Sequence, residues 1–203
     1  MQNPNKNSCS FSSKLRSYKF LHLPIPLHHS PSLPLSLWYI FEKMGVVTFA
    51  QELESPVAPD RLFKALMLDS HVLFPKLMPQ YIRSIDLVQG DGGVGSVRQA
   101  NFSQGSLLRY AKHRIDEQDA DNFRCKFTLI EGDILGDDLK SVVSEIEFVD
   151  DGNGGSICRM SSDYCSDRDI KFRDEDIEAG KDKAMELYRA VEAYLLANPT
   201  AYT

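Results

Sequence analysis

The chain has 203 residues, a length that fits one domain or one domain with an appendage, and its 42% hydrophobic content is enough for one core. The formal net charge of −6 is uneven: residues 1–43 hold five of the 23 basic residues and one of the 29 acidic residues, so the remainder carries −10. A domain this acidic repels a polyphosphate backbone, which argues against nucleic acid as a partner. Prolines or charges interrupt every long apolar run, so we expect no membrane partner either.

The first 43 residues differ in kind from the rest, with eight serines, five prolines and a single acid. The prolines exclude a stable helix in their part of this segment. Three interpretations stay open: an organelle transit peptide, a secretory signal with atypical prolines, or leader residues upstream of a natural start at Met44. We favour the third because a strand pattern begins directly after Met44. In each case we expect residues 1–43 to be disordered and to lie outside a domain of residues 44–203.

The first elements after this segment are a strand and two short helices. Alternating apolar residues predict the strand over 46–55. A proline and an aspartate in the first turn predict a helix over about 59–68. A second helix at about 72–78 is limited to one or two turns because Pro75 and Pro79 interrupt it.

Six further strands and a long helix complete the chain. Alternating residues between turn-forming clusters predict strands at 81–89, 96–104, 107–119, 122–133, 135–151 and 156–166. Apolar residues at three- and four-residue steps predict a helix over 174–198, which opens with acids and ends before a proline. This order predicts an α+β fold, in which hairpins form an antiparallel sheet and the long helix covers its inner face.

The segment GDGGVGS, residues 90–96, places four glycines in seven positions between two predicted strands. The backbone N–H groups of such a loop can converge on one anion, as they do in phosphate-binding loops. A Walker-type loop, however, needs Lys followed by Ser or Thr, and a dinucleotide-binding loop needs a following helix; this segment has neither. We expect a structural hairpin connection, with anion binding as a secondary alternative. Its residues are Gly90, Asp91, Gly92, Gly93, Val94, Gly95 and Ser96.

The four cysteines form no CxxC pair and have no metal-ligand spacing; they are Cys9, Cys125, Cys158 and Cys165. We interpret them as free thiols in a reducing compartment, and we expect no metal and no cofactor.

Four motifs follow one another after Met44: GDGGVGS, IEGDILGDDL, DGNGGSICRMSSDY and a terminal RAVEAYLLANPTAY. Together they resemble the plant pathogenesis-related class 10 proteins, the Bet v 1-like family, which includes a major pollen allergen. The resemblance extends from about Met44 to Thr203, whereas residues 1–43 match nothing in the family.

The resemblance implies a seven-stranded curved antiparallel sheet wrapped around the long C-terminal helix, two short helices closing one end, and a large apolar cavity. Members bind hydrophobic small molecules such as cytokinins, flavonoids, brassinosteroid-like sterols and other phenolics. It therefore implies binding, storage or transport of a hydrophobic metabolite in defence or stress. We expect a monomer in the cytoplasm, with the nucleus as an additional location.

The strand alternation nominates residues for the cavity wall, because on each strand the large apolar side chains select the inward face. A dry, filled core is the alternative for the same residues. The hydroxyls of Ser144, Ser162 and Tyr164 are expected to orient a ligand. The nominated residues are Leu66, Phe74, Leu77, Cys125, Phe127, Val142, Ser144, Ile146, Met160, Ser162, Tyr164, Leu187 and Val191.

Relatives of this type suggest two enzymatic alternatives. Reported ribonuclease positions match Arg98, Glu131, Glu192 and Tyr194, but the last two are two residues apart on a helix and point in different directions. No histidine pair is evident, and we interpret His113 as a strand-surface residue. Condensing enzymes of this fold need an inward lysine, for which Lys112 is the candidate.

A regulatory alternative comes from abscisic-acid receptors of the superfamily, which inhibit protein phosphatases. This chain has no proline-containing gate segment like theirs. We therefore expect a hormone-like ligand and rank receptor action, with a phosphatase as partner, below simple binding.

Overall fold

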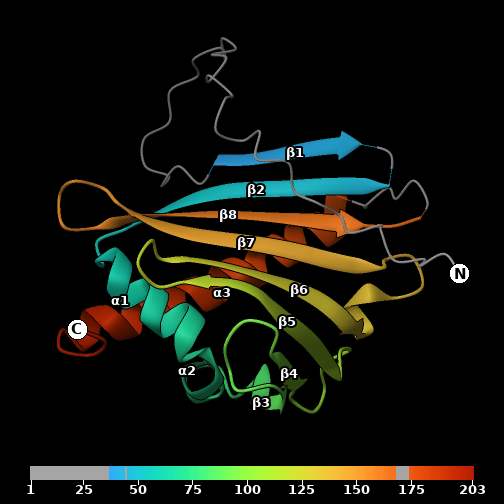
Figure 1. The fold of residues 1–203 in the computed structure, drawn as a ribbon, viewed down its shortest axis with the longest axis horizontal. Helices are drawn as coiled ribbons and strands as arrows, with labels where there is room; N and C mark the ends of the chain where they lie inside the picture. Colours follow the sequence, from blue (N-terminus) through green and yellow to red (C-terminus); the bar gives the residue numbers. More distant parts are fainter. Residues whose placement is uncertain (1–36, 44, 168–173) are drawn as a thin grey trace, which may run out of the picture. The chain divides into compact units, whose positions relative to one another are not determined.

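One antiparallel sheet organises the fold (Figure 1). The computed structural model describes residues 37–43, 45–167 and 174–203, with side chains for residues 45–167 and 182–203. Within these residues the sheet has eight strands in the order β1-β2-β8-β7-β6-β5-β4-β3. The strands are β1 (Leu37–Lys43), β2 (Val46–Ser55), β3 (Ile82–Gln89), β4 (Val97–Phe102), β5 (Tyr110–Asp119), β6 (Arg124–Gly132), β7 (Ser141–Asp150) and β8 (Ser156–Cys165). Strands β2 to β8 confirm the expected seven-stranded curved sheet.

Strand β1 adds an eighth strand that the sequence analysis did not expect. It pairs with β2 along its whole length, from Leu37 opposite Glu52 to Lys43 opposite Val46. These residues belong to the segment that we assigned to a disordered leader. They follow the last proline of that segment, Pro34, so no missing N–H or fixed φ angle prevents an extended strand. The remainder of the leader lies outside the described residues.

The helices are α1 (Pro59–Phe63), the π-helical turn η2 (Lys64–Leu68), α2 (Ser70–Leu77) and α3 (Asp174–Ala197), and a short 3₁₀ turn, η3, covers Asp133–Leu135. The predicted helices agree with α1 plus η2, and with α3. The second short helix begins two residues earlier than expected, because the Asp69 carbonyl accepts bonds from the N–H groups of Val72 and Leu73. Pro75 lies inside α2 near its end, where its missing N–H removes one helical bond.

Predicted strand ends were generally a few residues too long. The largest difference concerns 135–151, where the strand begins only at Ser141, after η3 and a turn. In Figure 1, α3 runs behind the sheet, and α1 and α2 lie at one end of it beside the C-terminus. Arg61 of α1 fixes this end, since its guanidinium donates to the carbonyls of Leu195, Asn198 and Ala201 at distances of 2.9–3.0 Å.

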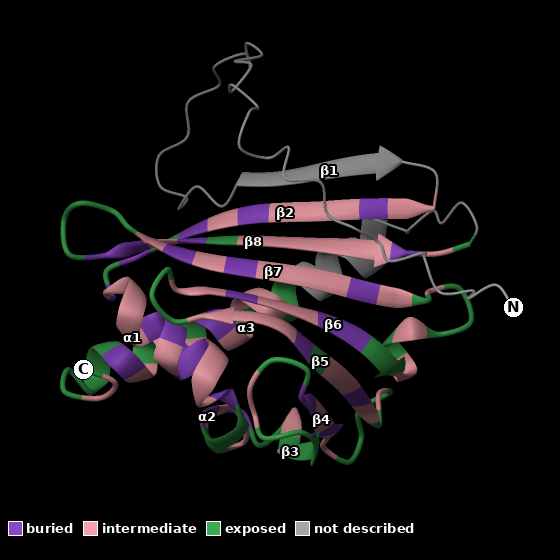
Figure 2. Ribbon diagram, in the orientation of Figure 1, coloured by how far each residue is buried: buried purple, intermediate pink, exposed green. Residues whose placement is uncertain are grey.

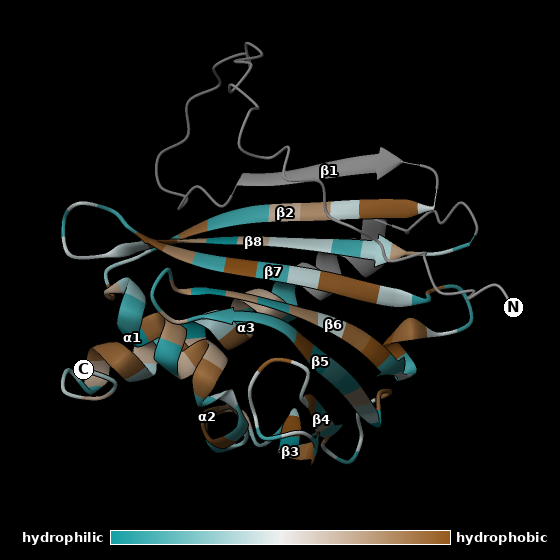
Figure 3. Cartoon of the chain, viewed as in Figure 1, coloured by the Kyte–Doolittle hydropathy of each residue, from teal (hydrophilic) through white to brown (hydrophobic). Residues whose placement is uncertain are grey.

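Alternation along the strands decides which side chains face the helices. Leu53, Phe148 and Cys158 are cross-strand neighbours, and they share a buried cluster with Val191 and Leu195 of α3. We call the sheet face that carries them the interior face. Figure 2 shows buried positions at intervals along β2, β7 and β6, and Figure 3 shows the matching alternation in hydropathy.

Candidate functional site

The interior face carries two separate buried clusters. The first, here called the α1-end cluster, contains Phe63, Phe148, Cys158, Val191 and Leu195, all at most 1% exposed, together with further residues of β2, η2 and α2. The second, the η3-end cluster, contains the buried residues Ala111, Leu129 and Val142, with Leu135 and Leu139 packed against them.

Between the two clusters lies a row of side chains that we call the middle row. Its members are paired across five adjacent strands in the order Phe49, Ser162, Ser144, Phe127 and Ile115. Ile115 is buried, but the other four keep part of their surface exposed although they face the helix side of the sheet. Fully buried residues thus gather at both ends of the interior face, whereas four of the five members of the middle row are only partly buried.

The middle row combines aromatic surface with hydroxyl groups. The hydroxyls of Ser144 and Ser162 are 2.9 Å apart and bond to each other across β7 and β8. The Phe127 ring meets the ring of His113 edge-on at 5.6 Å between centroids. The Tyr164 ring meets Phe49 in the same manner at 5.2 Å, and burial raises the pKa of the Tyr164 phenol, which therefore stays protonated at neutral pH.

Two basic residues also belong to the interior face, next to the middle row. His113 of β5 is paired with Leu129 of β6 on one side and with Arg98 of β4 on the other. Cross-strand partners share a face, so both basic side chains face the interior. Burial lowers the pKa of His113 from 6.5 to about 4, so its imidazole is neutral at pH 7.

This placement corrects the expectation that His113 is a strand-surface residue. The sequence contained the signal, because His113 alternates with Ala111 and Ile115, both of which are buried. Gln51 was also missed: it is 4% exposed, and its amide nitrogen donates to the Met160 sulfur at 3.4 Å. Its side-chain oxygen has no hydrogen-bond partner among the described residues. It shares its row with Met160, Ile146 and Cys125.

The nominated wall residues of the strands all belong to the interior face, by the cross-strand pairing of β6, β7 and β8. Among them Cys125, Val142 and Ile146 are buried. The nominated residues of the helices vary in burial: Leu66 and Val191 are buried, whereas Leu187 is partly exposed. Phe74 and Leu77 pack against the α1-end cluster while keeping part of their surface exposed.

The glycine-rich loop between β3 and β4 supplies its own carboxylate. Asp91 accepts hydrogen bonds from the Gly93 N–H at 2.9 Å and from the Ser96 hydroxyl at 3.3 Å, and the backbone bond from Gly93 is the main reason why the pKa of Asp91 is lowered. The Gly92 N–H donates to the Ser96 hydroxyl, and Gly95 donates to Ile115. Gly90 has a φ of +89°, and a Cβ there would lie 2.3 Å from the Ser96 hydroxyl. These contacts describe a structural hairpin connection.

Two of the four ribonuclease positions, Arg98 and Glu131, lie on opposite faces of the sheet. Arg98 is paired with His113 on the interior face, whereas Glu131 is paired with Lys112 on the opposite face. Tyr194 lies on α3 with the Lys76 ammonium 5.2 Å from its ring centroid. A carboxylate and a cation on opposite faces of one sheet cannot act on the same hydroxyl.

Lys112 also faces outward, so it is not the inward lysine that a condensing enzyme needs. Its ammonium bonds both carboxylate oxygens of Glu131 at 2.8 Å, and the Tyr110 hydroxyl donates to the same carboxylate at 2.9 Å. These bonds, that of Lys112 first, lower the pKa of Glu131.

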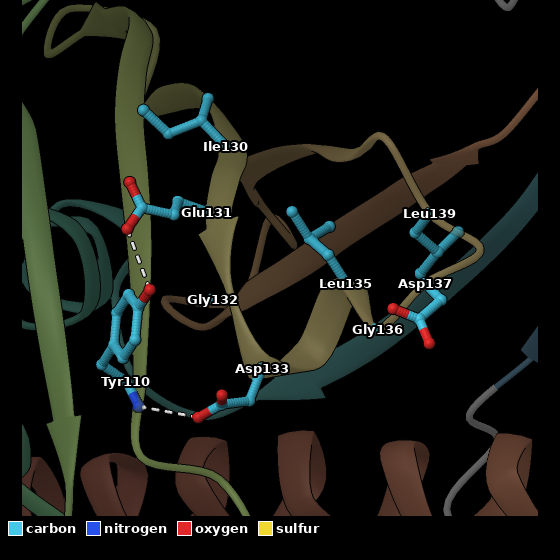
Figure 4. A pocket seen from close by; sticks show the side chains of 9 residues that line it. All are labelled: Tyr110, Ile130, Glu131, Gly132, Asp133, Leu135, Gly136, Asp137 and Leu139. Atoms are coloured by element: carbon cyan, nitrogen blue, oxygen red, sulfur yellow. Dashed lines mark hydrogen bonds between the residues drawn. The ribbon is translucent and has the colours of Figure 1, made fainter.

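Glu131 borders a pocket of about 490 Å³ that is wide open to solvent (Figure 4). Asp133 on its rim is held by Arg109, whose side chain and backbone N–H donate to the carboxylate and lower the pKa of Asp133 to about 2. Two of the pocket's carboxylates are thus already paired. The lining residues are Tyr110, Ile130, Glu131, Gly132, Asp133, Leu135, Gly136, Asp137 and Leu139.

Cys125, Cys158 and Cys165 are free thiols, as expected, and Cys9 lies outside the described residues. Burial raises the pKa of Cys125 to about 11, so its thiol is protonated at neutral pH. In the described part of the chain, no group of three metal-ligating side chains meets. No helix among the described residues is long and apolar enough to cross a membrane.

Comparison with known proteins gives a consistent family. Residues 44–198 match the model of the pathogenesis-related protein Bet v 1 family. The chain is 43% identical to the major allergen Pru ar 1 of Prunus armeniaca over 159 residues, which is 78% of this chain and 99% of the relative. It is 46% identical, with the same coverage, to the pathogenesis-related protein STH-21 of Solanum tuberosum.

Solved structures agree on the fold. The crystal structure of Ara h 8.0201 superposes with a TM-score of 0.69 at 34% identity, covering 76% of this chain and all of that chain. A norcoclaurine synthase from Thalictrum flavum superposes with a TM-score of 0.59 at 18% identity, covering 86% of this chain and 98% of that chain. At that identity the second likeness concerns the fold alone.

Proposed function

The chain belongs to the pathogenesis-related Bet v 1 family, and on this premise we propose that it binds a hydrophobic small molecule between its sheet and α3. The ligand would lie against the middle row, between the α1-end and η3-end clusters. We further propose that this binding serves to store or carry a plant metabolite, such as a hormone or a phenolic compound, in defence.

The observation that carries this proposal is the incomplete burial of the middle row. Phe49 and Phe127 face the interior, yet they retain exposed surface while neighbours two residues away along the same strands are buried. Interiors of folded domains are normally close-packed, so inward aromatic surface without full burial indicates unfilled space. An apolar ligand would remove that surface from water, which contributes about 25 cal/mol per Å² before ordering costs.

The polar groups of this region fit an apolar ligand with few hydrogen-bonding atoms. Ser144 and Ser162 bond each other in the present structure, and each hydroxyl has further donor or acceptor capacity. Pockets for small molecules characteristically combine an apolar wall with a small number of such groups. The serine pair and the Tyr164 hydroxyl would orient the ligand.

The test is binding of a neutral apolar fluorophore, N-phenylnaphthylamine, to the full chain and to two matched variants. Ser162→Leu fills the middle row, whereas Ser161→Leu makes the same change on the opposite face, where Ser161 pairs with Ala50 and Glu145. We expect saturable binding by the wild type, a loss of affinity of about tenfold in Ser162→Leu, and wild-type affinity in Ser161→Leu.

Absence of saturable binding to the wild type would refute the proposal, as would equal affinities in the two variants. If the wild type binds the fluorophore, native mass spectrometry of the full chain with a mixed hormone and flavonoid library would identify the ligand class by mass.

A further inference from the structure

We propose that the interior selects a ligand with one anionic group, such as a carboxylate or sulfonate, on an apolar body, and that Arg98 and His113 hold that group. This inference rests on the proposed function, and it names the ligand class of the same site.

Among the residues whose side chains the structure describes, Arg98 is an inward cation without a carboxylate partner. Its guanidinium donates to three neutral oxygens: the Met67 carbonyl at 3.2 Å, the Ser70 hydroxyl at 3.4 Å and the Gly92 carbonyl at 3.4 Å. None of the ion pairs in the described part of the chain includes Arg98.

Arg98 differs from most of the other arginines in and beside the sheet. Arg109, Arg114, Arg124 and Arg159 each form an ion pair with an Asp or Glu. Arg83 of β3 is in none of the ion pairs of the described residues, but its side chain is exposed to solvent. Arg98 is half-buried, where an unpaired charge costs more than it does at the surface. A ligand anion would supply the missing partner.

Arg98 also has unused donors. A guanidinium carries five N–H groups, and the three bonds described involve only its two terminal nitrogens, so Nε–H is free to donate. Together with one terminal N–H, this group makes the two parallel bonds that a carboxylate or sulfonate accepts.

His113 lies directly opposite Arg98 on the neighbouring strand. Cβ atoms of such pairs are about 4.5–5.5 Å apart, so one small anionic group can contact both side chains. Within residues 45–167 and 182–203, the imidazole nitrogens of His113 have no hydrogen-bond partner. A neutral imidazole has one N–H, and that group is available to donate to the same anion.

The net charge of the domain restricts where an anionic ligand can bind. Because the domain from residue 44 onward has a net charge of −10, it repels anions in general. An anionic ligand would therefore bind through a local cation or not at all. The apolar body would extend from the basic pair towards Phe127, whose ring contacts His113.

Arg98 also has a structural role, since its bonds join the glycine-rich loop to η2 and α2. The test must separate this tether from recognition of an anion. Two fluorophores with the same ring skeleton do so: anilinonaphthalene sulfonate carries a sulfonate, and N-phenylnaphthylamine lacks it.

The experiment measures the affinity of both fluorophores for the full chain and three variants. In Arg98→Gln we expect the sulfonate to bind at least about tenfold more weakly, with the neutral compound unchanged within about twofold. Arg114→Gln removes the same charge from the opposite face of the neighbouring strand and should change neither affinity. His113→Asp retains the Arg98 tether but places a carboxylate opposite it. This variant should lower the affinity for the sulfonate fluorophore by a similar factor.

The inference would be overturned if Arg98→Gln lost affinity for both fluorophores equally and His113→Asp showed no selective loss of affinity for the sulfonate. Arg98 would then be a structural tether only. Unchanged binding of the sulfonate in both variants would overturn it as well. If the neutral compound does not bind the wild type, the proposed function fails, and that outcome is distinct from the other two.

Discussion

The α1-end cluster and the middle row lie on the same sheet face and obey the same strand alternation, yet they are filled differently. Phe148 and Cys158 are at most 1% exposed, whereas Phe127, Ser144 and Ser162 remain partly exposed. The difference shows that alternation determines which side chains face inward, but that the covering elements determine whether the space is filled.

The covering elements are concentrated at one end. Arg61 fastens the C-terminal part of α3 to α1, and Lys64 of η2 adds a bond to the Tyr202 carbonyl at 3.3 Å. Among the described elements, α3 lies against α1, η2 and α2. The short helices therefore hold α3 at the α1 end.

The largest expected effect comes from truncating one phenylalanine in each region. Phe148→Ala should lower the free energy of unfolding by about 3–5 kcal/mol, because it opens a cavity in close-packed surroundings. Phe127→Ala should cost about half as much, because part of that ring is already exposed. Urea unfolding of both variants measures the difference, and equal losses would mean that the middle row is as well packed as the α1-end cluster.

A pH titration tests how dry the surroundings of His113 are. Burial lowers its pKa from 6.5 to about 4, so between these values the unfolded chain binds a proton that the folded chain does not. The free energy of unfolding should therefore fall as the pH drops from 6.5 to 4, by up to about 3 kcal/mol from this residue.

His113→Asn should remove that part of the pH dependence, whereas removing the exposed His71 by His71→Asn should leave it intact. Urea midpoints between pH 4 and pH 7 provide the measurement. An unchanged slope in His113→Asn would show that water reaches the imidazole freely.

The opposite substitution enlarges one small residue in each region, and the expected change in stability is smaller than for the truncated phenylalanines. Cys158→Leu adds volume where the side chain is 0% exposed, so it should destabilise the fold by about 1–3 kcal/mol. Ser162→Leu on the same strand and face should change stability by less than about 1 kcal/mol, since Ser162 is only partly buried. Thermal unfolding by circular dichroism compares the two, and a larger loss in Ser162→Leu would reverse the assignment of the two regions.

These contrasts also show what could be predicted from the sequence. Alternation in β6, β7 and β8 was sufficient to place Phe127, Ser144 and Ser162 on the interior face, because period-2 patterning is a local property of each strand. The three- and four-residue spacing of the long helix likewise placed Val191 on its inward stripe, where it is buried.

Other features depend mainly on pairing between strands. Lys112 and His113 have the opposite faces to those expected: Ala111 and Ile115 carried a local signal, but the other side chains of β5 are polar on both faces, and the pairing with Arg98 and Glu131 fixes the register. Register is weakly specified wherever neither face of a strand is clearly apolar. The additional strand β1 also depends on a partner, since its place in the sheet is defined by its pairing with β2.

The smallest expected effect concerns Gln51, which lies in the row of the α1-end cluster that borders the middle row. Its side-chain oxygen is buried and has no donor among the described residues, and such a group costs free energy that an apolar side chain of similar size does not. Gln51→Leu should therefore leave the free energy of unfolding unchanged or raise it by up to about 1 kcal/mol in urea titrations of the ligand-free protein. A loss of more than about 1 kcal/mol would mean that the oxygen has a donor, such as a bound water. In that case the boundary of the closed region would lie one row nearer to α1, since water would reach the row that Gln51 shares with Ile146 and Cys125.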